Sequence, residues 1–230
     1  MISVIVPVRN AMPYLPAALA SIAAQGIAQT EVIIVDGASS DGSREVAAAY
    51  PHVRLIDQQG DGLAAARNAG LAAAHCTLIA FLDADDIWTA SSLATRLAYV
   101  AQHPACPGVI GQIRRFLQAD TPLPPGYAGD WLEQPAPGYT PGALLMQRTL
   151  FAEIGAFDAT LAVGCDSDWF ARAQDAGLAP TLLAETVLYK RIHAANLSAQ
   201  ISSYRRELLT VARRSLQRRG YIPEHSTASL

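Results

Sequence analysis

The chain has 230 residues, of which 51% are hydrophobic, and its formal net charge at pH 7 is -3. This length suits one compact domain, or one core with an appended part, and is long enough for a substantial buried interior. The slightly negative charge gives no reason to expect nucleic acid as a partner. No segment approaches the ~20 apolar residues of a membrane-spanning helix, and the N-terminus lacks the basic region of a signal peptide. We therefore expect a soluble protein with no transmembrane segment.

The three cysteines are Cys76, Cys106 and Cys165. Their spacing fits neither a disulfide framework nor a zinc site. Such cysteines are typical of reduced thiols, which predicts a cytoplasmic protein.

The first half of the chain alternates between strand-like and helix-like segments. Strands are predicted at residues 3–8, 31–35, 53–57 and 77–82, because these runs are short, apolar and rich in β-branched residues. Helices are predicted between them, at residues 13–25, 43–50 and 62–74. The alternation favours an α/β fold with a doubly wound, mostly parallel sheet. Ligands bind beyond the carboxyl ends of the strands in such sheets, so the polar residues there form the candidate site.

The second half is less regular. Residues 120–141 contain so many prolines and glycines that long regular elements are excluded there. The aromatic residues Tyr127, Trp131 and Tyr139 in this segment favour an ordered flap over a disordered loop. Around it, strands are predicted at residues 109–117, 143–146 and 181–189, and helices at residues 90–103, 148–154, 166–176 and 201–219.

The last predicted helix carries six arginines, at positions 205, 206, 213, 214, 218 and 219. One interpretation of this charge is contact with an anionic membrane surface or an acidic partner, and the other is a solvated helical face. The arginines do not form one clean stripe along the helix. We therefore favour the solvated face and keep peripheral membrane contact as the alternative.

Three carboxylates, Asp83, Asp85 and Asp86, end the apolar run of the fourth strand. Crowded at a strand tip, they repel one another, and a hard divalent cation carrying phosphate oxygens would offset that repulsion. A solvated turn that caps a helix is the alternative, because the D-x-D pattern is short and has many chance matches.

Other polar residues follow the remaining strands. Asp36 ends the second strand and could accept a hydrogen bond from the N3–H of a uracil ring. Asp41 and Ser43, in the turn that follows, are expected to cap the next helix. Arg67 could reach a pyrophosphate or a base edge with its planar fork, or it could pair with a neighbouring acid.

A second acidic pair, Asp166 and Asp168, opens a predicted helix, where capping explains one carboxylate. Two acids next to Trp169 also fit a general base beside a bound acceptor. Further on, His193 could ligate a metal or a phosphate, although a lone histidine is more often structural.

Together these segments resemble the family 2 inverting glycosyltransferases with the GT-A fold, from residue 3 to about residue 198. The resemblance is carried by VIVPVRN at 4–10, VDGASSDGS at 35–43, ARNAG at 66–70, FLDADD at 81–86, GAFD at 155–158, DSDW at 166–169 with Arg172, and HAANLS at 193–198. No single segment is decisive, but their order and spacing together are specific.

The resemblance implies a nucleotide-sugar donor, for which we expect a UDP-sugar, and an acceptor hydroxyl that displaces the nucleoside diphosphate in one step. The residues implied for the nucleoside, base and diphosphate are Pro7, Asn10, Asp36, Ser39, Arg67, Asp83 and Asp85. Asp85, Asp86 and His193 are implied as ligands of Mn²⁺ or Mg²⁺, and the motif leaves open which of the two acids binds the ion directly.

The resemblance makes Asp166 the catalytic base. Many relatives have Glu before it, where this chain has Cys165. This departure puts the class of acceptor in doubt and keeps Asp168 as the alternative base. We expect the segment around Trp169 and the proline-rich segment to select the acceptor, which can be a saccharide, a lipid-linked sugar, a small metabolite or a peptide.

The expected parts are a nucleotide-sugar-binding part at residues 1–117, an acceptor-binding and catalytic part of the same domain at 118–200, and a C-terminal helix and tail at 201–230. The sequence disfavours two alternative functions. A nucleotidyltransferase usually has a glycine-rich loop after the first strand, whereas residues 8–13 contain no glycine. A non-catalytic sugar-nucleotide-binding protein is disfavoured by the intact acids at 83–86 and 166.

Overall fold

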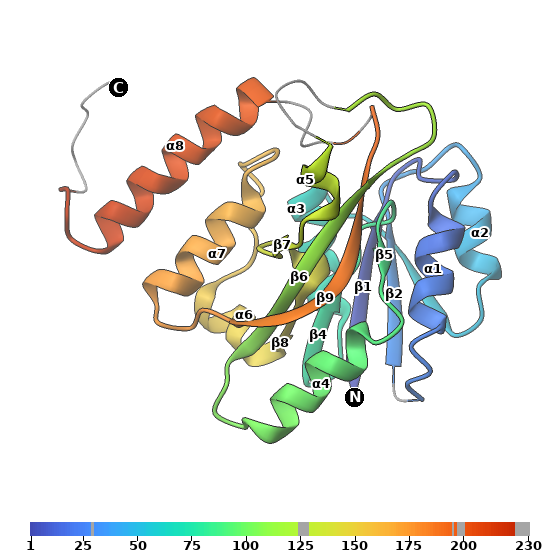
Figure 1. Cartoon of the computed structure of the whole chain (residues 1–230), viewed down its shortest axis with the longest axis horizontal. Coiled ribbons are helices and arrows are strands. Elements are labelled where there is room, and N and C mark those ends of the chain that lie inside the picture. The colour runs from blue at the N-terminus through green and yellow to red at the C-terminus, as the bar shows by residue number, and fades with distance from the viewer. Residues whose placement is uncertain (29, 124–128, 195, 197–200, 224–230) are drawn as a thin grey trace.

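A computed structural model describes residues 1–28, 30–123, 129–194, 196 and 201–223. One nine-stranded sheet runs through the molecule, with helices on both of its faces (Figure 1). The expectation of a doubly wound α/β fold with a C-terminal helix is confirmed. None of the helices in these ranges is both long and apolar enough to cross a bilayer.

Four parallel strands form the first half of the sheet, in the order β3-β2-β1-β4. They are β1 (Ile2–Val8), β2 (Thr30–Asp36), β3 (Val53–Asp57) and β4 (Leu78–Phe81). The helices that connect them are α1 (Leu15–Ala23), α2 (Ser43–Ala49) and α3 (Gly62–Ala73). Because the strands are parallel, their carboxyl ends meet at one edge, as the alternating pattern predicted.

The central strand β1 is buried on both faces. Val4 and Val6 pack into a cluster that includes Leu15 and Leu19 of α1. Ile5 points the other way, into a cluster that contains Phe81 and Trp169. Successive side chains of a strand alternate between the faces of a sheet, so consecutive apolar residues such as Val4, Ile5 and Val6 suit a strand covered on both sides.

The second half of the sheet is mixed. Beyond β4 lie β8 (Leu144–Gln147), β6 (Gly108–Leu117), β9 (Thr181–Ile192) and β5 (Ile87–Trp88), and β7 (Ala136–Pro137) pairs with β6. β4 and β8 are antiparallel, whereas β6 and β9 are parallel. The sequence did not predict β5 or β7, because two residues are too few to show a period. β9 also extends three residues beyond the predicted residue 189 and so reaches the vicinity of His193.

The remaining helices are α4 (Ser92–Gln102), α5 (Asp130–Glu133), α6 (Arg148–Ile154), α7 (Cys165–Asp175) and α8 (Ile201–Arg218), with a 3-10 turn at Pro141–Ala143. In the described parts of the proline-rich segment, residues 120–123 and 129–141, the regular elements are the short α5 and β7 and the start of the 3-10 turn, in agreement with its composition. The guanidinium of Arg115 lies 4.6 Å from the ring centroid of Trp131. Tyr139 is 58% exposed and stands edge-on against Phe170, while Tyr127 lies outside the described residues.

Candidate active site

The loops after β1 and β2 are tied together at the strand tips. The backbone N–H of Asn10 donates to Ser39 Oγ at 3.0 Å, and the Asn10 side-chain oxygen accepts from the N–H of Ser40 at 2.8 Å. Asn10 and Ala38 both have a positive φ, 49° and 58°, a conformation that is uncommon for residues other than glycine. Pro7 lies buried in β1, opposite Val35. Of the residues implied for the nucleoside, Asn10 and Ser39 are therefore in direct contact.

Asp36 is buried at the tip of β2, with 2% of its surface exposed. Its carboxylate accepts the N–H of Ser39 at 3.2 Å and the guanidinium of Arg44 at 2.9 Å. Arg44 also reaches Asp57 at 2.7 Å, and its hydrogen bonds to Asp36 and Asp57 raise the pKa of the guanidinium. Sequence reasoning missed Arg44, whose one signal was its position in the first turn of the helix after Asp36.

Asp41 and Ser43 do not cap α2, so this expectation was wrong. The helix begins after Gly42 without a side-chain cap. Asp41 instead accepts hydrogen bonds from the hydroxyl of Ser43 at 2.6 Å and from the N–H of Met12 at 2.9 Å, and Ser43 Oγ accepts from the N–H of Ala11 at 2.9 Å. These two side chains fasten the β1 loop to the β2 loop, next to Asn10 and Ser39.

The three acids after β4 converge as the crowded sequence predicted. One oxygen from each of Asp83, Asp85 and Asp86 lies within 4.8 Å of the others. Asp85 Oδ2 lies 2.9 Å from His193 Nε2 and 3.2 Å from the side-chain amide of Asn196. The cluster and His193 thus form one group of oxygen and nitrogen donors, drawn from the β4 tip and the end of β9.

Asp86 is the deepest of the three, with 1% exposure. It accepts the N–H of Arg191 at 2.9 Å and the ammonium of Lys190 at 3.3 Å. Burial raises the pKa of Asp86 to about 7, and the neighbouring carboxylates of Asp85 and Asp83 add to the shift, against the attraction of Lys190. Sequence reasoning missed this role of Lys190, whose only signal was its place three residues before His193.

Arg67 is completely buried and joins the two acidic parts of the site. It donates through Nη2 to Asp83 at 2.8 Å and through Nη1 to Asp166. Its Nε has no hydrogen-bond partner within the described ranges. This arrangement corresponds to the acid-pairing alternative for Arg67, because both of its terminal nitrogens are engaged by carboxylates.

The two acids that flank Arg67 have shifted pKa values of opposite sign. Burial raises the pKa of Asp83, but the charges of Arg67 and Lys190 and the hydrogen bond from Arg67 together outweigh it and leave that pKa below its ordinary value. For Asp166, burial is the larger effect, so its pKa lies above the ordinary value in spite of Arg67. A raised pKa makes a carboxylate a better proton acceptor, as a general base requires.

Asp168 faces a different set of residues from Asp166. It is 3% exposed and accepts Arg172 Nε at 2.7 Å. Arg172 in turn donates to the backbone oxygens of Ile154 at 2.6 Å and Ala156 at 2.7 Å. This network holds α7 against the turn that follows α6, so the carboxylate of Asp168 stabilises the packing of these two elements.

Two near neighbours of Asp166 in the sequence, Cys165 and Trp169, are buried. Trp169 has no exposed surface and stacks on Phe151 with ring centroids 4.9 Å apart. The ring of Trp169 thus completes the core, and the expectation that the segment around it selects the acceptor stays a prediction about its exposed neighbours. Burial raises the pKa of the Cys165 thiol to about 12, so the thiol stays protonated and is a poor nucleophile.

The helix that carries Arg67 also connects two distant motifs. The side-chain amide of Asn68 donates to the backbone oxygen of Phe157 at 2.8 Å and accepts the N–H of the same residue at 2.9 Å. At Gly70, an added Cβ would lie 2.3 Å from Ile5 Cγ2. The ARNAG segment thus makes three separate contacts: Arg67 pairs with the acids, Asn68 bonds to Phe157, and Gly70 allows α3 to approach Ile5 closely.

His193 is fixed from two sides. It is 8% exposed, and its ring centroid lies 4.6 Å from that of Tyr14. Its backbone N–H donates to Asn196 Oδ1 at 2.6 Å. Tyr14 also lies 5.1 Å from the guanidinium of Arg191. Leu197 and Ser198, which complete the sequence motif, lie outside the described residues.

Two solved structures align with most of this chain. S. aureus TarS 1-349, in complex with UDP-GlcNAc, aligns with a TM-score of 0.73 and 17% identity over 94% of this chain and 66% of that chain. The mannosyltransferase PcManGT from Pyrobaculum calidifontis, in complex with GDP-Man and Mn²⁺, aligns with a TM-score of 0.67 and 21% identity over 94% and 64%. The chain therefore has the GT-A fold.

The family model described as "Glycosyl transferase family 2" matches residues 3–174, and the chain belongs to this family of glycosyltransferases. The uncharacterized glycosyltransferase EpsJ of Bacillus subtilis is 35% identical over 106 residues, which are 44% of this chain and 30% of EpsJ. The Escherichia coli enzyme named UDP-Glc:alpha-D-GlcNAc-diphosphoundecaprenol beta-1,3-glucosyltransferase WfgD is 33% identical over 106 residues, 45% of this chain and 42% of WfgD. The match thus spans less than half of the length of these two relatives.

Proposed function

We propose that this glycosyltransferase is an inverting, metal-dependent enzyme that transfers a sugar from a UDP-sugar to an acceptor hydroxyl. The observation that carries the proposal is the buried Arg67, which holds Asp83 of the acid cluster and Asp166 of α7 on its two terminal nitrogens. A donor-binding acid and a candidate base are thereby kept at a fixed separation. This is the arrangement that a single displacement needs, with one group on each side of the reacting carbon.

In this proposal Asp166 is the catalytic base. It removes the proton from an acceptor hydroxyl as the oxygen forms a bond to the anomeric carbon of the donor. The bond from that carbon to the diphosphate breaks at the opposite face, and the nucleoside diphosphate leaves with the electron pair. The raised pKa of Asp166 and its side-chain exposure of 25% support this role, because a base must reach its substrate.

A divalent cation fits the acid cluster. Carboxylate oxygens are the donors that Mg²⁺ and Mn²⁺ prefer. Burial and, after it, the neighbouring carboxylates raise the pKa of Asp86, and a positive ion would relieve the repulsion among the three acids. We assign Asp85 and His193 as direct ligands, because Asp86 is more deeply buried and already bonded to Lys190 and Arg191. A bound Mn²⁺ or Mg²⁺ supplies Lewis-acid neutralisation of the leaving diphosphate.

The nucleoside is assigned to the tips of β1 and β2. Asn10 and Ser39 line this part, and Asp36 lies beneath them with acceptor capacity left, since each carboxylate oxygen can accept more than one hydrogen bond. A uracil N3–H suits such an acceptor. The name of WfgD and the complex of TarS both refer to UDP-sugars, whereas the complex of PcManGT contains GDP-Man.

Thermal unfolding with UDP, GDP and dTDP, each with and without Mn²⁺, tests the donor assignment. A ligand present at about 100 times its dissociation constant adds roughly 2.7 kcal/mol of stability, which raises the unfolding midpoint by about 5 to 10 °C for a chain of this size. We expect a shift with UDP that requires Mn²⁺. Release of the nucleoside diphosphate from UDP-sugars, with water as the surrogate acceptor, then tests the reaction.

The variant Asp85→Asn should lose the Mn²⁺-dependent shift. Glu153→Gln is the matched control, because it removes an exposed carboxylate of α6 outside the cluster, and it should keep the full shift. A midpoint that responds to no nucleotide in a folded sample would refute the donor site. A shift with GDP alone would change the assigned nucleobase from uracil to guanine and would leave the metal assignment unchanged.

A further inference from the structure

Helix α8 is attached to the body of the protein by its polar side chains. The carboxylate of Glu207 accepts the backbone N–H groups of Ala162 at 3.1 Å, Val163 at 3.0 Å and Gly164 at 2.6 Å. These donors directly precede α7, so Glu207 places a negative charge at the N-terminus of that helix. The loop that leads to Asp166 is thus held by α8.

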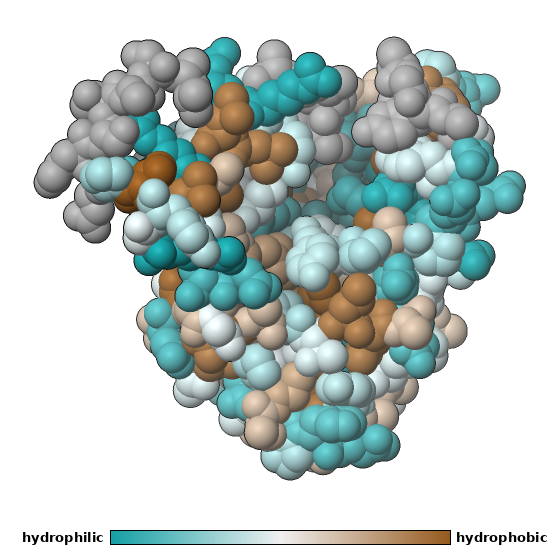
Figure 2. All heavy atoms as spheres, turned by 60° about the vertical axis from the view of Figure 1, so that its left-hand side comes forward, coloured by the Kyte–Doolittle hydropathy of each residue, from teal (hydrophilic) through white to brown (hydrophobic). Residues whose placement is uncertain are grey.

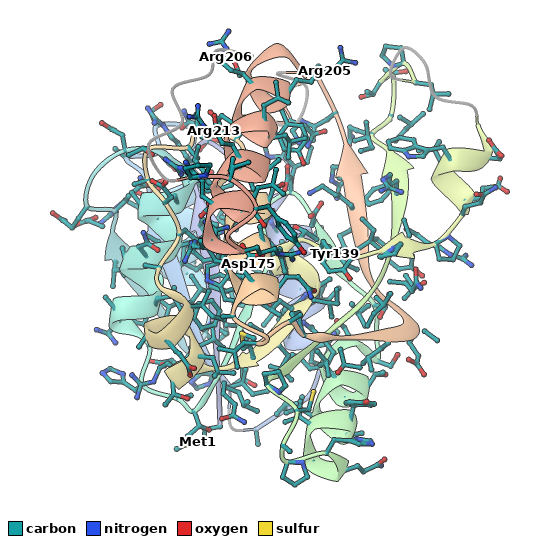
Figure 3. All side chains as sticks on the ribbon, turned by 90° about the vertical axis from the view of Figure 1, so that its left-hand side faces the viewer. Met1, Tyr139, Asp175, Arg205, Arg206 and Arg213 are labelled. Atoms are coloured by element: carbon teal, nitrogen blue, oxygen red, sulfur yellow. The ribbon has the colours of Figure 1, made fainter. Side chains whose placement is uncertain are left out.

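Three of the six arginines of this region are used in the same attachment. Arg214 donates to Asp158 at 2.8 Å, and Arg218 and Arg219 donate to Asp175 at 2.7 and 2.6 Å. Figure 3 shows Asp175 against one end of α8, while Arg205 and Arg206 point away from the molecule at the other end. Arg214 and Arg218 lie on the docked face of α8 and Arg219 directly follows the helix, which explains why the sequence shows no single stripe of charge.

The opposite face of α8 combines the remaining arginines with exposed leucines. Arg205, Leu209, Arg213 and Leu216 follow one another at spacings of four, four and three residues, which puts them on one side of a helix. Leu209 is 62% exposed and Leu216 is 43% exposed. In Figure 2 hydrophobic and hydrophilic side chains lie next to one another over this part of the surface. We call Arg205, Arg206, Leu209, Arg213 and Leu216 the outer face of α8.

The outer face carries no negative charge. Glu207 is the one acidic residue of α8, and it is turned to the docked face and bonded to the loop at 162–164. Arg205, Arg206 and Arg213 make no ion pair with any residue in the described ranges. Just beyond the helix, Tyr221 is 73% exposed. The surface therefore offers cations around an apolar strip, with an aromatic ring at its end.

We propose that the outer face of α8 binds the surface of an anionic lipid bilayer. Arginines lie at the level of the lipid phosphates while leucines enter the boundary between headgroups and acyl chains, and tyrosine is favoured at the same depth. A nucleic acid would match the arginines but not the leucines. A second copy of α8 would bring its own arginines against Arg205, Arg206 and Arg213, and like charges in contact repel one another.

This mode of binding has a geometric consequence for the catalytic side of the protein. Ser167 Oγ lies 3.1 Å from the hydroxyl of Tyr204 on α8, and Ser167 is the neighbour of Asp166. A bilayer that holds the outer face of α8 therefore lies close to the element that carries the proposed base. The inference concerns the location of the protein and does not depend on which sugar or acceptor it uses.

Sedimentation of the full chain with lipid vesicles tests the proposal. Vesicles of equal parts phosphatidylcholine and phosphatidylglycerol should bind it, vesicles of phosphatidylcholine alone should not, and salt should weaken the binding by screening. The variant Arg205→Gln/Arg206→Gln should lower the partition coefficient by about 30-fold, since each arginine contributes about 1 kcal/mol at such a surface. Leu209→Ser and Leu216→Ser should each lower it roughly tenfold.

The matched control is Arg54→Gln/Arg114→Gln, which removes the same charge elsewhere on the surface and should bind vesicles like the parent. All variants should unfold at the parent's midpoint, because the changed side chains are exposed or half-exposed. Absence of binding to anionic vesicles, or an equal loss in the control, would overturn the proposal. So would self-association that disappears in Leu209→Ser, because a second copy would then cover the face. The measurement uses neither donor nor acceptor, so its outcome is independent of the transferase assignment.

Discussion

Arg67 and Asp166 are 99 positions apart in sequence and form an ion pair in which the guanidinium has no exposed surface. The same guanidinium holds Asp83 at 2.8 Å. A buried cation is costly unless it is paired, so the two acids and the arginine stabilise one another. The pair therefore couples the stability of the fold to the geometry of the candidate site.

The first prediction concerns Arg67. Arg67→Met leaves Asp83 and Asp166 close together without their cation, and we expect a loss of about 3 kcal/mol in the free energy of unfolding. For this chain length the unfolding midpoint should fall by about 6 to 12 °C. Arg67→Lys keeps the charge but cannot reach both acids with one ammonium, so it should be more stable than the Met variant and still release nucleoside diphosphate more slowly than the parent. Equal midpoints for the parent and Arg67→Met would contradict the argument.

The second prediction separates the two acids of α7. Asp166→Asn should slow the release of nucleoside diphosphate by about 1000-fold, the contribution typical of a general base, while the UDP and Mn²⁺ stabilisation persists. Asp168→Asn removes the partner of Arg172, so it should lower the free energy of unfolding by about 2 kcal/mol and keep most of the turnover. The reverse pattern of rates and midpoints would make Asp168 the base.

The third prediction concerns the close approach of α3 to β1. Gly70→Ala puts a methyl group 2.3 Å from Ile5 Cγ2, and such overpacking costs about 1 to 3 kcal/mol. We expect the unfolding midpoint to fall by several degrees. Gly129→Ala is the control, because no atom lies within 4 Å of its added Cβ, and it should leave the midpoint unchanged or slightly raised. Equal unfolding midpoints for the two variants would show that the close contact between Gly70 and Ile5 does not limit stability.

The fourth prediction concerns the attachment of α8. Burial raises the pKa of Asp175, but hydrogen bonds from Arg219, Arg218 and Ser215 outweigh it and leave the pKa below its ordinary value. A carboxyl group with a depressed pKa in the folded state contributes stability above its unfolded pKa, about 3.9, and that contribution disappears as the pH falls through the folded value. The end of α8 should therefore loosen in acid.

Asp175→Asn reproduces the uncharged state at neutral pH. The arginines are partly exposed, so we expect a loss of only about 1 kcal/mol and roughly fivefold faster hydrogen exchange in the last turns of α8. Amides of β1 and β4 should exchange at the parent's rate and serve as the internal reference. Unchanged exchange in α8 at neutral pH would show that Asp175 does not hold the helix.

The sheet and the edge that carries the candidate site were predictable from sequence because their causes are local. Apolar β-branched runs define the strands at residues 3–8 and 77–82, and the parallel connection places the residues that follow them at one edge. The convergence of Asp83, Asp85 and Asp86 needs no long-range information, because they are sequence neighbours. The assignment of the family rests on the same local segments and their order.

The partners of these residues were decided by tertiary structure. Asp166 and Asp168 are two positions apart on a helix, so their side chains point about 200° apart around its axis. Only the packing of Trp169 into the core fixes which of them meets Arg67. The buried state of Trp169 and the contact of Arg44 with Asp36 likewise depend on elements that the sequence does not order in space.

The sequence by itself therefore determined which elements form and which polar residues lie at the strand tips. Both depend on the hydrophobic pattern and the order of segments, which can be read from neighbouring residues. Tertiary structure alone decided which acid Arg67 holds, which face of α8 stays free, and where His193 meets Asp85. Those outcomes depend on the rotation of each helix about its axis and on contacts across a hundred residues of chain. Packing of the whole core sets the rotation of the helices and these long-range contacts.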